Sequence, residues 1–336
     1  MLLIIFARLN GGLTMNIREL RNMFPALSRT VYGKQLVYFD NAATAQRSQS
    51  VIDKWTQLTI GANANIHRAV HKLAVDATDE YESTRDAVKE YINAAAREEI
   101  VFTSGTTGSI NLVAFSFGET FVNKGDEIIV SESEHHSNIV PWQMLCQRKG
   151  AVLRVLHVDE DGHLNLEELK SLLNPKTRIV AVTQISNVLG ILNPVKEIVS
   201  ICHSVGCPVL IDGAQGMVHE GVDVQDVDCD FYAFSGHKLY AATGTGVLYG
   251  KRKWLDQMVP YQGGGEMIAT VRFSGTTYAP LPEKFEAGTQ NINAIPTLEP
   301  AIEMLKLMKD KELLNAQEAV SQYLFHALTS NPRIRL

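Results

Sequence analysis

The sequence has few cysteines, and their placement argues against two classes of protein. Four cysteines occur in 336 residues, with no Cys-x-x-Cys pair and no spacing typical of metal ligands. A disulfide framework and a cysteine-based metal site are therefore not expected. Reduced thiols are typical of cytosolic proteins, so we expect a cytoplasmic protein without a bound metal.

Strong charge, long apolar runs and a nucleotide-binding glycine turn are also missing. The formal net charge is −6, from 31 basic and 37 acidic residues, and no Lys/Arg cluster predicts nucleic-acid binding. The apolar run 1–7 ends at Arg8, so it is too short for a membrane span and a poor signal peptide. Neither 244–246 nor 263–265 forms a Gly-x-Gly-x-x-Gly turn, so a nicotinamide cofactor has little support.

Short apolar runs instead alternate with helical patterns along most of the chain. The predicted strands are 101–103, 126–130, 151–157, 179–183, 208–211 and 231–234, and the predicted helices include 76–92, 105–117, 166–173 and 195–205. A hydrophobic content of 45% is enough for one large core. Strand and helix alternation predicts parallel strands with right-handed crossovers, which is an α/β fold.

Two charged residues follow predicted buried strands, at the edge where open α/β sheets bind ligands. Lys238 comes after the apolar run 231–234, and Asp212 directly follows the apolar run 208–211. A lysine amine with a lowered pKa can form a Schiff base with an aldehyde cofactor. Pyridoxal phosphate also needs a carboxylate at its pyridinium nitrogen. A loop lysine and a helix-capping aspartate are the alternatives for each residue alone, and the pair favours a pyridoxal-phosphate site.

A glycine-rich turn supplies a candidate phosphate site. Residues 105–109 follow the strand that ends at 103 and open the helix that runs to 117. Backbone N–H groups at a helix N-terminus, with the hydroxyls of Thr106 and Thr107, can hold an anion. An ordinary helix cap by either threonine is the alternative.

Eight short motifs occur in a defined order along the chain. They are Asp40-Asn41-Ala42-Ala43-Thr44, Asn65-Ile66-His67-Arg68, Gly105-Thr106-Thr107, Glu134-His135-His136-Ser137-Asn138, Ser186-Asn187-Val188-Leu189-Gly190, Asp212-Gly213-Ala214-Gln215, Ser235-Gly236-His237-Lys238 and Glu286-Ala287-Gly288-Thr289. In order and spacing they resemble the fold-type I pyridoxal-phosphate enzymes of the class-V aminotransferase family. Within that family the chain resembles the cysteine desulfurases of the SUF-type and selenocysteine lyase-like branch. The implied fold is a large domain with a mostly parallel, seven-stranded type of sheet between helices, plus an incomplete small C-terminal domain.

The resemblance implies a role for each residue around the cofactor ring. Lys238 would carry the cofactor, Asp212 would hold its pyridinium nitrogen and Gln215 would bond its phenolate oxygen. His135 would stack on the ring and move protons. Asn187 would lie near the phenolate oxygen and the substrate carboxylate.

The same resemblance implies a phosphate site shared between two subunits. Thr106, Thr107, Ser235 and His237 would bind the phosphate of their own subunit. Thr289 would reach the phosphate of the neighbouring subunit, which implies a homodimer.

Residues at the substrate side are implied in the same way. Ala42 and Ala43 suit a tight loop bordering the substrate pocket, although an ordinary turn explains them equally well. His67 and Arg68 would line the entrance, and Asn187 would face the substrate.

The implied activity is that of a transferase in sulfur metabolism. A cysteine desulfurase converts L-cysteine to L-alanine and passes the sulfur to an enzyme cysteine as a persulfide, for iron–sulfur cluster assembly. L-selenocysteine is a possible second substrate of this branch, and a SUF-type sulfur-acceptor protein is the implied partner; no nucleic acid or membrane partner is expected. The alternatives are another fold-type I lyase or epimerase, such as a kynureninase-like enzyme, and a non-enzymatic truncated gene product.

The family's nucleophilic cysteine and the arginine that binds the substrate carboxylate belong to a region after Leu336. Cys146 and Cys202 fall in helical patterns, Cys207 abuts a strand and Cys229 precedes the Lys238 strand, so all four are expected to be structural. We therefore expect a C-terminally truncated chain that is inactive by itself.

Three segments are expected along the chain. Residues 1–32 would be an N-terminal extension and the opening amphipathic helix, with Met15 as an alternative start. Residues 33–294 would form the large cofactor-binding domain, and 295–336 would begin the small domain with two helices. Pro300 should lie in the first turn of the first of them.

Overall fold

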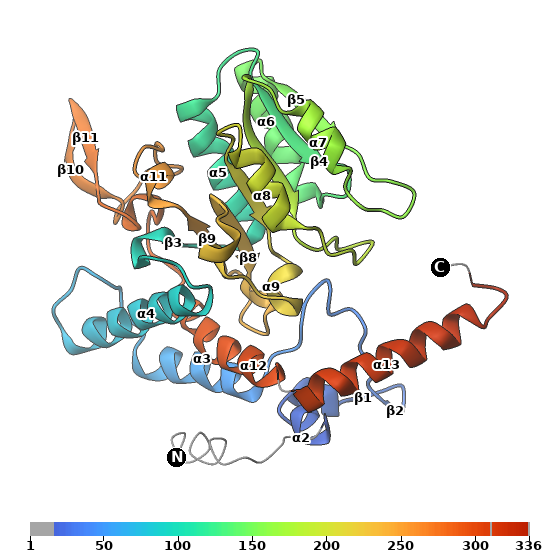
Figure 1. Ribbon diagram of the computed structural model, residues 1–336. Helices are drawn as coiled ribbons and strands as arrows, with labels where there is room; N and C mark the ends of the chain where they lie inside the picture. Colours follow the sequence, from blue (N-terminus) through green and yellow to red (C-terminus); the bar gives the residue numbers. More distant parts are fainter. Residues whose placement is uncertain (1–16, 310, 335–336) are drawn as a thin grey trace.

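The computed structural model describes residues 17–309 and 311–334, and the expectations for residues 1–16 lie outside this range. A seven-stranded sheet with the order β3-β9-β8-β7-β6-β4-β5 forms its centre (Figure 1). The strands are β3 (Ile100–Thr103), β4 (Glu127–Ser131), β5 (Val152–Leu156), β6 (Thr177–Thr183), β7 (Val209–Asp212), β8 (Phe231–Ser235) and β9 (Gly246–Gly250). Strands β4 to β8 pair in parallel, which confirms the predicted α/β fold.

Strand β9 was not predicted, and it is antiparallel to both of its neighbours, β3 and β8. It begins and ends with glycine, so its strand signal is confined to the three residues Val247, Leu248 and Tyr249. Its insertion between β3 and β8 places the turn before α5 (Thr106–Phe121) next to the end of β8. This contact matters for the site described below.

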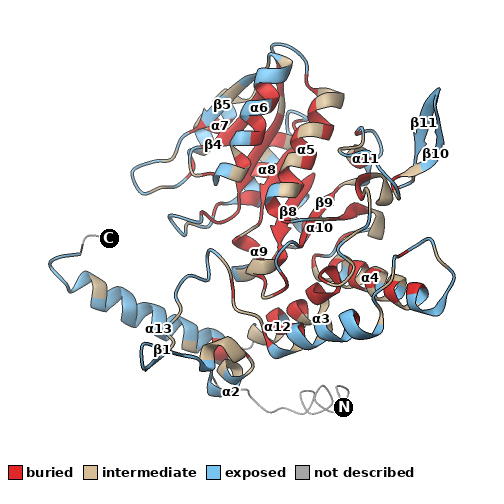
Figure 2. Cartoon of the chain, turned by 180° about the vertical axis from the view of Figure 1, so that it is seen from behind, coloured by how far each residue is buried: buried red, intermediate tan, exposed pale blue. Residues whose placement is uncertain are grey.

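The sheet is covered on both faces, as its apolar strands require. In β6, Ile179 and Ala181 belong to a buried cluster with residues of α5 and of α6 (Val140–Lys149). Val180 and Val182 point to the other face and belong to a cluster with residues of α7 (Leu166–Leu172) and α8 (Val195–His203). Figure 2 shows the buried residues concentrated along the strands and the inner faces of these helices.

Helix α12 (Leu298–Met308) packs against α3 (Gln49–Gly61) and α4 (Lys72–Tyr91), and its buried residues join the cluster on the α8 face of the sheet. Pro300 lies in its first turn, as predicted. Helix α13 (Lys311–Thr329) runs away from the body of the molecule in Figure 1. A domain boundary at residue 294 stays a prediction.

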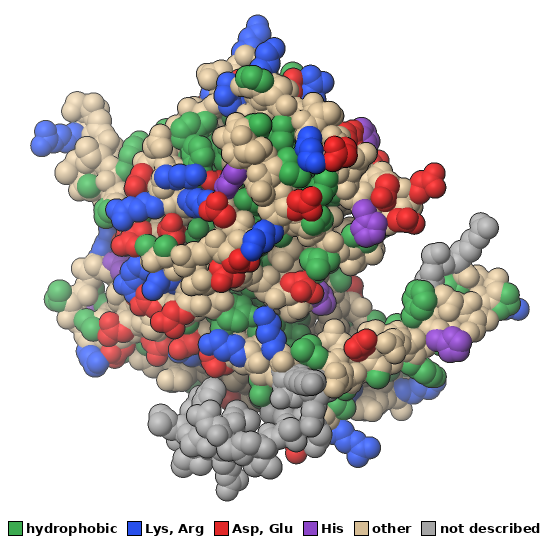
Figure 3. All heavy atoms as spheres, in the orientation of Figure 1, with side chains coloured by type: hydrophobic (Ala, Val, Ile, Leu, Met, Phe, Trp, Pro, Cys, Tyr) green, Lys and Arg blue, Asp and Glu red, His purple; other side chains and the backbone are tan. Residues whose placement is uncertain are grey.

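The remaining elements are short. They are α2 (Ile17–Asn22), β1 (Thr30–Val31), β2 (Lys34–Gln35), α9 (Gly216–His219), α10 (Val224–Val227), α11 (Arg252–Leu255), β10 (Ile268–Arg272) and β11 (Gly275–Tyr278). Strands β10 and β11 form a hairpin that projects from the body (Figure 1). Basic and acidic side chains are interspersed over the face shown in Figure 3. Within 17–309 and 311–334, no helix has the length and apolar character needed to cross a membrane.

Candidate active site

A pocket of about 500 Å³ opens at the C-terminal ends of the parallel strands. It brings together eleven of the predicted site residues, which are Ala42, Ala43, Thr106, Thr107, His135, Asn187, Asp212, Gln215, Ser235, His237 and Lys238. A wider groove of about 640 Å³ lies beside α3, and among the described residues that line it Arg47 is the one ionisable side chain and none is a carboxylate. The chemical groups therefore point to the pocket at the strand ends.

Lys238 ends a short 3-10 turn (Gly236–Lys238) that follows β8 directly. Partial burial lowers the pKa of its ammonium, and the nearby Asp212 carboxylate opposes that shift. The lowered pKa makes the neutral, nucleophilic amine more accessible near neutral pH. The turn needs glycine at position 236, since a Cβ there would overlap the Thr245 hydroxyl.

Asp212 is the last residue of β7, and its side chain is buried in the pocket wall. Burial raises the pKa of this carboxyl to about 6, while the Ala214 N–H, at 2.9 Å, and Lys238 act in the opposite direction. Among the described residues, only the Ala214 N–H donates a hydrogen bond to it. A buried carboxylate with an oxygen still able to accept suits a cationic N–H donor such as a pyridinium.

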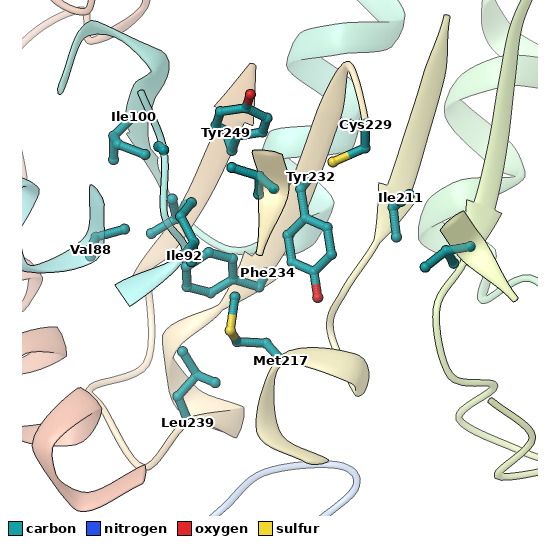
Figure 4. Close-up of a cluster of buried hydrophobic side chains, with 14 of the residues drawn as sticks. Val88, Ile92, Ile100, Ile211, Met217, Cys229, Tyr232, Phe234, Leu239 and Tyr249 are labelled. Atoms are coloured by element: carbon teal, nitrogen blue, oxygen red, sulfur yellow. The ribbon is translucent and has the colours of Figure 1, made fainter. Parts of the chain in front are cut away.

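Position 213 must be glycine because the side chain of Tyr232 lies directly below the turn that follows Asp212. Tyr232 of β8 points into the core with Phe234, close to Met217 of α9 (Figure 4). Its hydroxyl is bonded to Gln184, and a Cβ on Gly213 would overlap its ring. The glycine thus lets the chain turn directly above a buried tyrosine.

A cradle for an anion forms where α5 begins. The Thr106 N–H donates to Ser235 Oγ at 2.8 Å, and the two hydroxyls lie 2.7 Å apart. Gly105 has a φ of 145°, which favours glycine, and an added Cβ on Gly246 would overlap its backbone. The 16-residue helix α5 points its N-terminus into the pocket, where the backbone N–H groups favour a phosphate.

The His135 ring has a defined hydrogen-bond pattern. Its Nδ1 accepts the Ser137 N–H at 3.1 Å and also lies 2.8 Å from Ser137 Oγ. Partial burial lowers the pKa of the imidazole, and the positive charge of Lys238 adds to this effect. The bond to Nδ1 favours the tautomer with the proton on Nε2, and the lowered pKa favours the neutral ring, which suits stacking on an aromatic cofactor.

The loop that carries Ala42 and Ala43 is held against the segments that carry Gln215 and His237. Gln215 Nε2 donates to Ala42 O at 2.8 Å, and the Ala45 N–H donates to His237 O at 3.0 Å. His237 Nδ1 also lies 3.1 Å from Thr44 Oγ1. These bonds hold the loop in place where Ala42 and Ala43 line the pocket.

Comparison with known proteins gives the family. The model for the class-V aminotransferases matches residues 37–336. The chain belongs to the class-V aminotransferase family. Members of this family depend on pyridoxal phosphate. An amine, a buried carboxylate and a helix N-terminus line one pocket here, and these groups fit the chemistry of the cofactor's aldehyde, ring nitrogen and phosphate.

Similar curated proteins carry the name cysteine desulfurase. One, from Pectobacterium carotovorum subsp. carotovorum, is 47% identical over 321 residues, which cover 95% of this chain and 79% of the relative. Another, from Synechococcus elongatus, is 49% identical over 296 residues, which cover 88% of this chain and 47% of the relative.

Solved structures of cysteine desulfurases are also similar. The CsdA enzyme of Escherichia coli, in an S-sulfonic acid form, has a TM-score of 0.84 at 39% identity, over 95% of this chain and 78% of the other. The apo enzyme of Thermococcus onnurineus has a TM-score of 0.81 at 35% identity, over 88% of this chain and 72% of the other.

Three predicted site residues of this class-V chain do not line the pocket. His67 Nε2 lies 3.1 Å from Glu82, and Arg68 Nε lies 2.6 Å from Glu266. Thr289 follows Gly288, whose N–H donates to Gly265 O, so its loop lies beside the segment that bears Glu266. The roles of His67, Arg68 and Thr289 stay predictions.

The glutamate of the Glu286-Ala287-Gly288-Thr289 motif is part of the core. Glu286 is buried and pairs with the fully buried Arg85, with Nη1 to Oε1 at 2.8 Å and Nη2 to Oε2 at 3.0 Å. It also accepts the Phe102 N–H of β3 at 2.7 Å. Glu286 therefore fixes the start of the Thr289 loop to the sheet.

Sequence reasoning missed several pocket residues. Thr183 is the last residue of β6, so the strand-end rule that selected Asp212 would also have selected it. Glu134, in the fourth of the eight motifs, does not line the pocket, but its buried carboxyl lies close enough to Asp212 for the two carboxyls to interact electrostatically. Asp40 and Ser137 also line the pocket, but no local signal separates them from ordinary turn residues.

None of the four cysteines lines the pocket, and all four are unpaired and buried. Burial raises the pKa of each thiol, to about 12 for Cys202. This confirms the expectation that they are structural, because a nucleophilic cysteine needs a lowered pKa and access to solvent.

Proposed function

We propose that this chain is a pyridoxal-phosphate-dependent cysteine desulfurase, which acts on L-cysteine and releases L-alanine. The observation that carries the proposal is that Lys238 and Asp212 line one pocket beside the N-terminus of α5. The cysteine desulfurases that are 47–49% identical support this choice within the family.

The bound cofactor would supply an electron sink for negative charge that develops on the substrate. Asp212 would keep a proton on the ring nitrogen, because its carboxylate is buried and has an oxygen able to accept. Lys238 would hold the cofactor aldehyde and, as a free amine, move a proton at the substrate α-carbon. His135 would stack on the ring with its Nε2–H, and Gln215 would bond the phenolate oxygen.

The phosphate would be held by the cradle at α5. Thr106, Thr107, Ser235 and His237 line the pocket at this place. The exposed Thr289 lies outside the pocket, so we propose that it completes the phosphate site of a second copy in a homodimer.

The substrate would enter beside the Ala42 and Ala43 loop, with Asn187 bonding its carboxylate. His67 and Arg68 are not among the lining residues of the pocket, and we propose that they lie at its entrance. L-selenocysteine would bind in the same way, since selenium and sulfur occupy similar volumes.

The sulfur must leave on a thiolate that is not among the four cysteines of this chain. The Cβ–S bond of the substrate breaks, an S–S bond forms on the acceptor thiol, and the β-carbon takes a proton to become the methyl group of alanine. Because Cys146, Cys202, Cys207 and Cys229 are buried away from the pocket, we propose an acceptor thiol elsewhere, with a SUF-type acceptor protein as the onward partner. The unpaired thiols support a cytoplasmic location.

A second candidate is a fold-type I lyase of the kynureninase-like kind, which needs no cysteine nucleophile. The two candidates differ in the bond that is broken, Cβ–S against a carbon–carbon bond.

The test begins with binding. Purified protein is mixed with pyridoxal phosphate, reduced with borohydride and digested, and the modified lysine is located by mass spectrometry. We expect the label on Lys238 in the wild type and no label in Lys238→Ala, with Lys284→Ala, a partly buried lysine outside the pocket, as the matched control. A label on another lysine would contradict the assignment.

The reaction is then tested with L-cysteine and with L-kynurenine in the presence of a thiol acceptor. Alanine formed from cysteine with one equivalent of persulfide supports desulfuration. Anthranilate formed from kynurenine would support the second candidate instead.

A further inference from the structure

A buried glutamate behind the pocket connects the segment that carries His135 to the end of β6. Glu134 Oε1 accepts the Thr183 N–H at 2.8 Å, and Oε2 accepts Asn138 Nδ2 at 2.6 Å. Ser131, the last residue of β4, is bonded to the same carboxyl through its hydroxyl. One side chain thus joins two strand ends and the 3-10 turn His136–Asn138.

The bond to Thr183 continues the sheet beyond its last paired residues. Along β6, the N–H groups of Val180 and Gln184 donate to the β7 side, so the N–H of Thr183 faces β4. The β4 ladder with β6 ends at the Val130 and Ala181 pair. Glu134 therefore supplies the acceptor that β4 no longer provides, at the strand end where Thr183 lines the pocket.

The second carboxylate oxygen of Glu134, Oε2, holds the turn after His135 through its hydrogen bond with Asn138. Asn138 Oδ1 accepts the indole N–H of the fully buried Trp142 at 2.9 Å, so its Nδ2 is oriented toward Glu134. The Asn138 N–H donates to His135 O at 2.8 Å. Movement of Asn138 would therefore move the His135 backbone and the Ser137 N–H that His135 Nδ1 accepts.

We propose that Glu134 is a positioning residue, which holds the His135 ring and the Thr183 end of β6 in the arrangement that receives the cofactor. The proposal rests on the proposed function, since it assigns His135 to cofactor binding.

The charge state of Glu134 is consistent with this role. The pKa of its carboxyl is raised to about 8, chiefly by burial and also by the neighbouring Asp212, while its three hydrogen-bond donors act in the opposite direction. At neutral pH the proton can be shared with the Ser131 hydroxyl, which donates or accepts. Asp212 can then carry the negative charge in the pocket without a second one beside it.

The test compares Glu134→Gln and Glu134→Ala with Glu132→Gln. In Glu134→Gln, the amide oxygen could still accept the Thr183 N–H, but an NH₂ group would replace the oxygen that accepts Asn138 Nδ2. In Glu134→Ala, all of these hydrogen bonds are lost. Glu132 is the matched control, because it is a nearby glutamate on the surface that does not line the pocket. The affinity for pyridoxal phosphate is measured by fluorescence titration, and the His135 ring nitrogens are followed by ¹⁵N NMR in the cofactor-free protein.

We expect wild type and Glu132→Gln to show His135 as the Nε2–H form and to bind the cofactor equally. Glu134→Gln should bind about tenfold more weakly, the equivalent of one lost hydrogen bond to a charged or polar group, and should show mixed ring forms. Glu134→Ala should be weaker still. If the alanine variant does not fold, the cofactor affinity and the His135 signals of Glu134→Gln alone test the proposal.

A folded Glu134→Gln protein with unchanged cofactor affinity and unchanged His135 signals would overturn the proposal. If the wild type itself does not bind pyridoxal phosphate, the proposed function fails, whereas the NMR comparison of the cofactor-free proteins still tests the link between Glu134 and His135.

Discussion

The buried pair of Arg85 and Glu286 allows a quantitative prediction about stability. The Arg85 side chain has no solvent exposure and the Glu286 side chain has 2%. The guanidinium also donates to Ile100 O at 2.7 Å and to Glu82, and it lies 4.5 Å above the Phe102 ring. Replacing Arg85 with methionine keeps much of the volume but leaves the Glu286 charge buried and uncompensated.

Removing one partner of such a buried pair typically lowers the free energy of unfolding by about 3–5 kcal/mol. For Arg85→Met we expect a loss of this size and a Tm lower by about 4–7 °C, because the entropy of unfolding scales with the length of the chain. Arg97→Met is the control, since Arg97 also pairs with Glu82 and Asp86 but its side chain is 41% exposed. It should lose less than about 1 kcal/mol.

The double variant Arg85→Met/Glu286→Gln tests the physical reason. The amide removes the unpaired charge and can still accept the Phe102 N–H, so the double variant should be more stable than Arg85→Met. Unfolding in urea, followed by circular dichroism, gives the free energies. Equal losses for Arg85→Met and Arg97→Met, or a double variant less stable than Arg85→Met, would refute the reasoning.

Three further predictions concern the pocket and the core. Gly213→Ala should lower the free energy of unfolding by about 1–3 kcal/mol and weaken cofactor binding, because the new Cβ meets Tyr232. Gly61→Ala, at the end of α3 with open space around it, should lower neither the stability nor the affinity in thermal-shift and titration assays. In the cofactor-free protein, the Asp212 pKa of about 6 lies above the usual value of 3.8, so the folded state binds the extra proton and stability should fall as pH rises from about 4 to 6. The loss is on the order of 3 kcal/mol, and urea titrations across this pH range should show a shallower fall in Asp212→Asn. The four cysteines should resist iodoacetamide at pH 8 in the native protein and react after unfolding, as counted by mass spectrometry, and rapid native labelling of Cys202 would contradict its raised pKa.

The sequence by itself determined the strand ends and the residues placed there. Lys238 and Asp212 were found because a buried parallel strand is a local apolar run, and the residue that follows it must lie at the edge of the sheet. The turn before α5 was predicted in the same way. Glycine and threonine at a strand-to-helix junction are typical of a tight turn that begins a helix, and both are visible in the local sequence. These predictions needed no knowledge of which strands are neighbours.

Only the tertiary structure decided which distant groups meet. Strand β9 enters the sheet between β3 and β8, and its five residues give no sign of that position. Arg85 and Glu286 are 201 residues apart, and Glu134 and Thr183 are 49 apart. Residues so far apart in the chain leave no local pattern in the sequence that could reveal the contact. The contact depends on the order of the strands in the sheet, and on burial, because a buried polar group needs a hydrogen-bond partner.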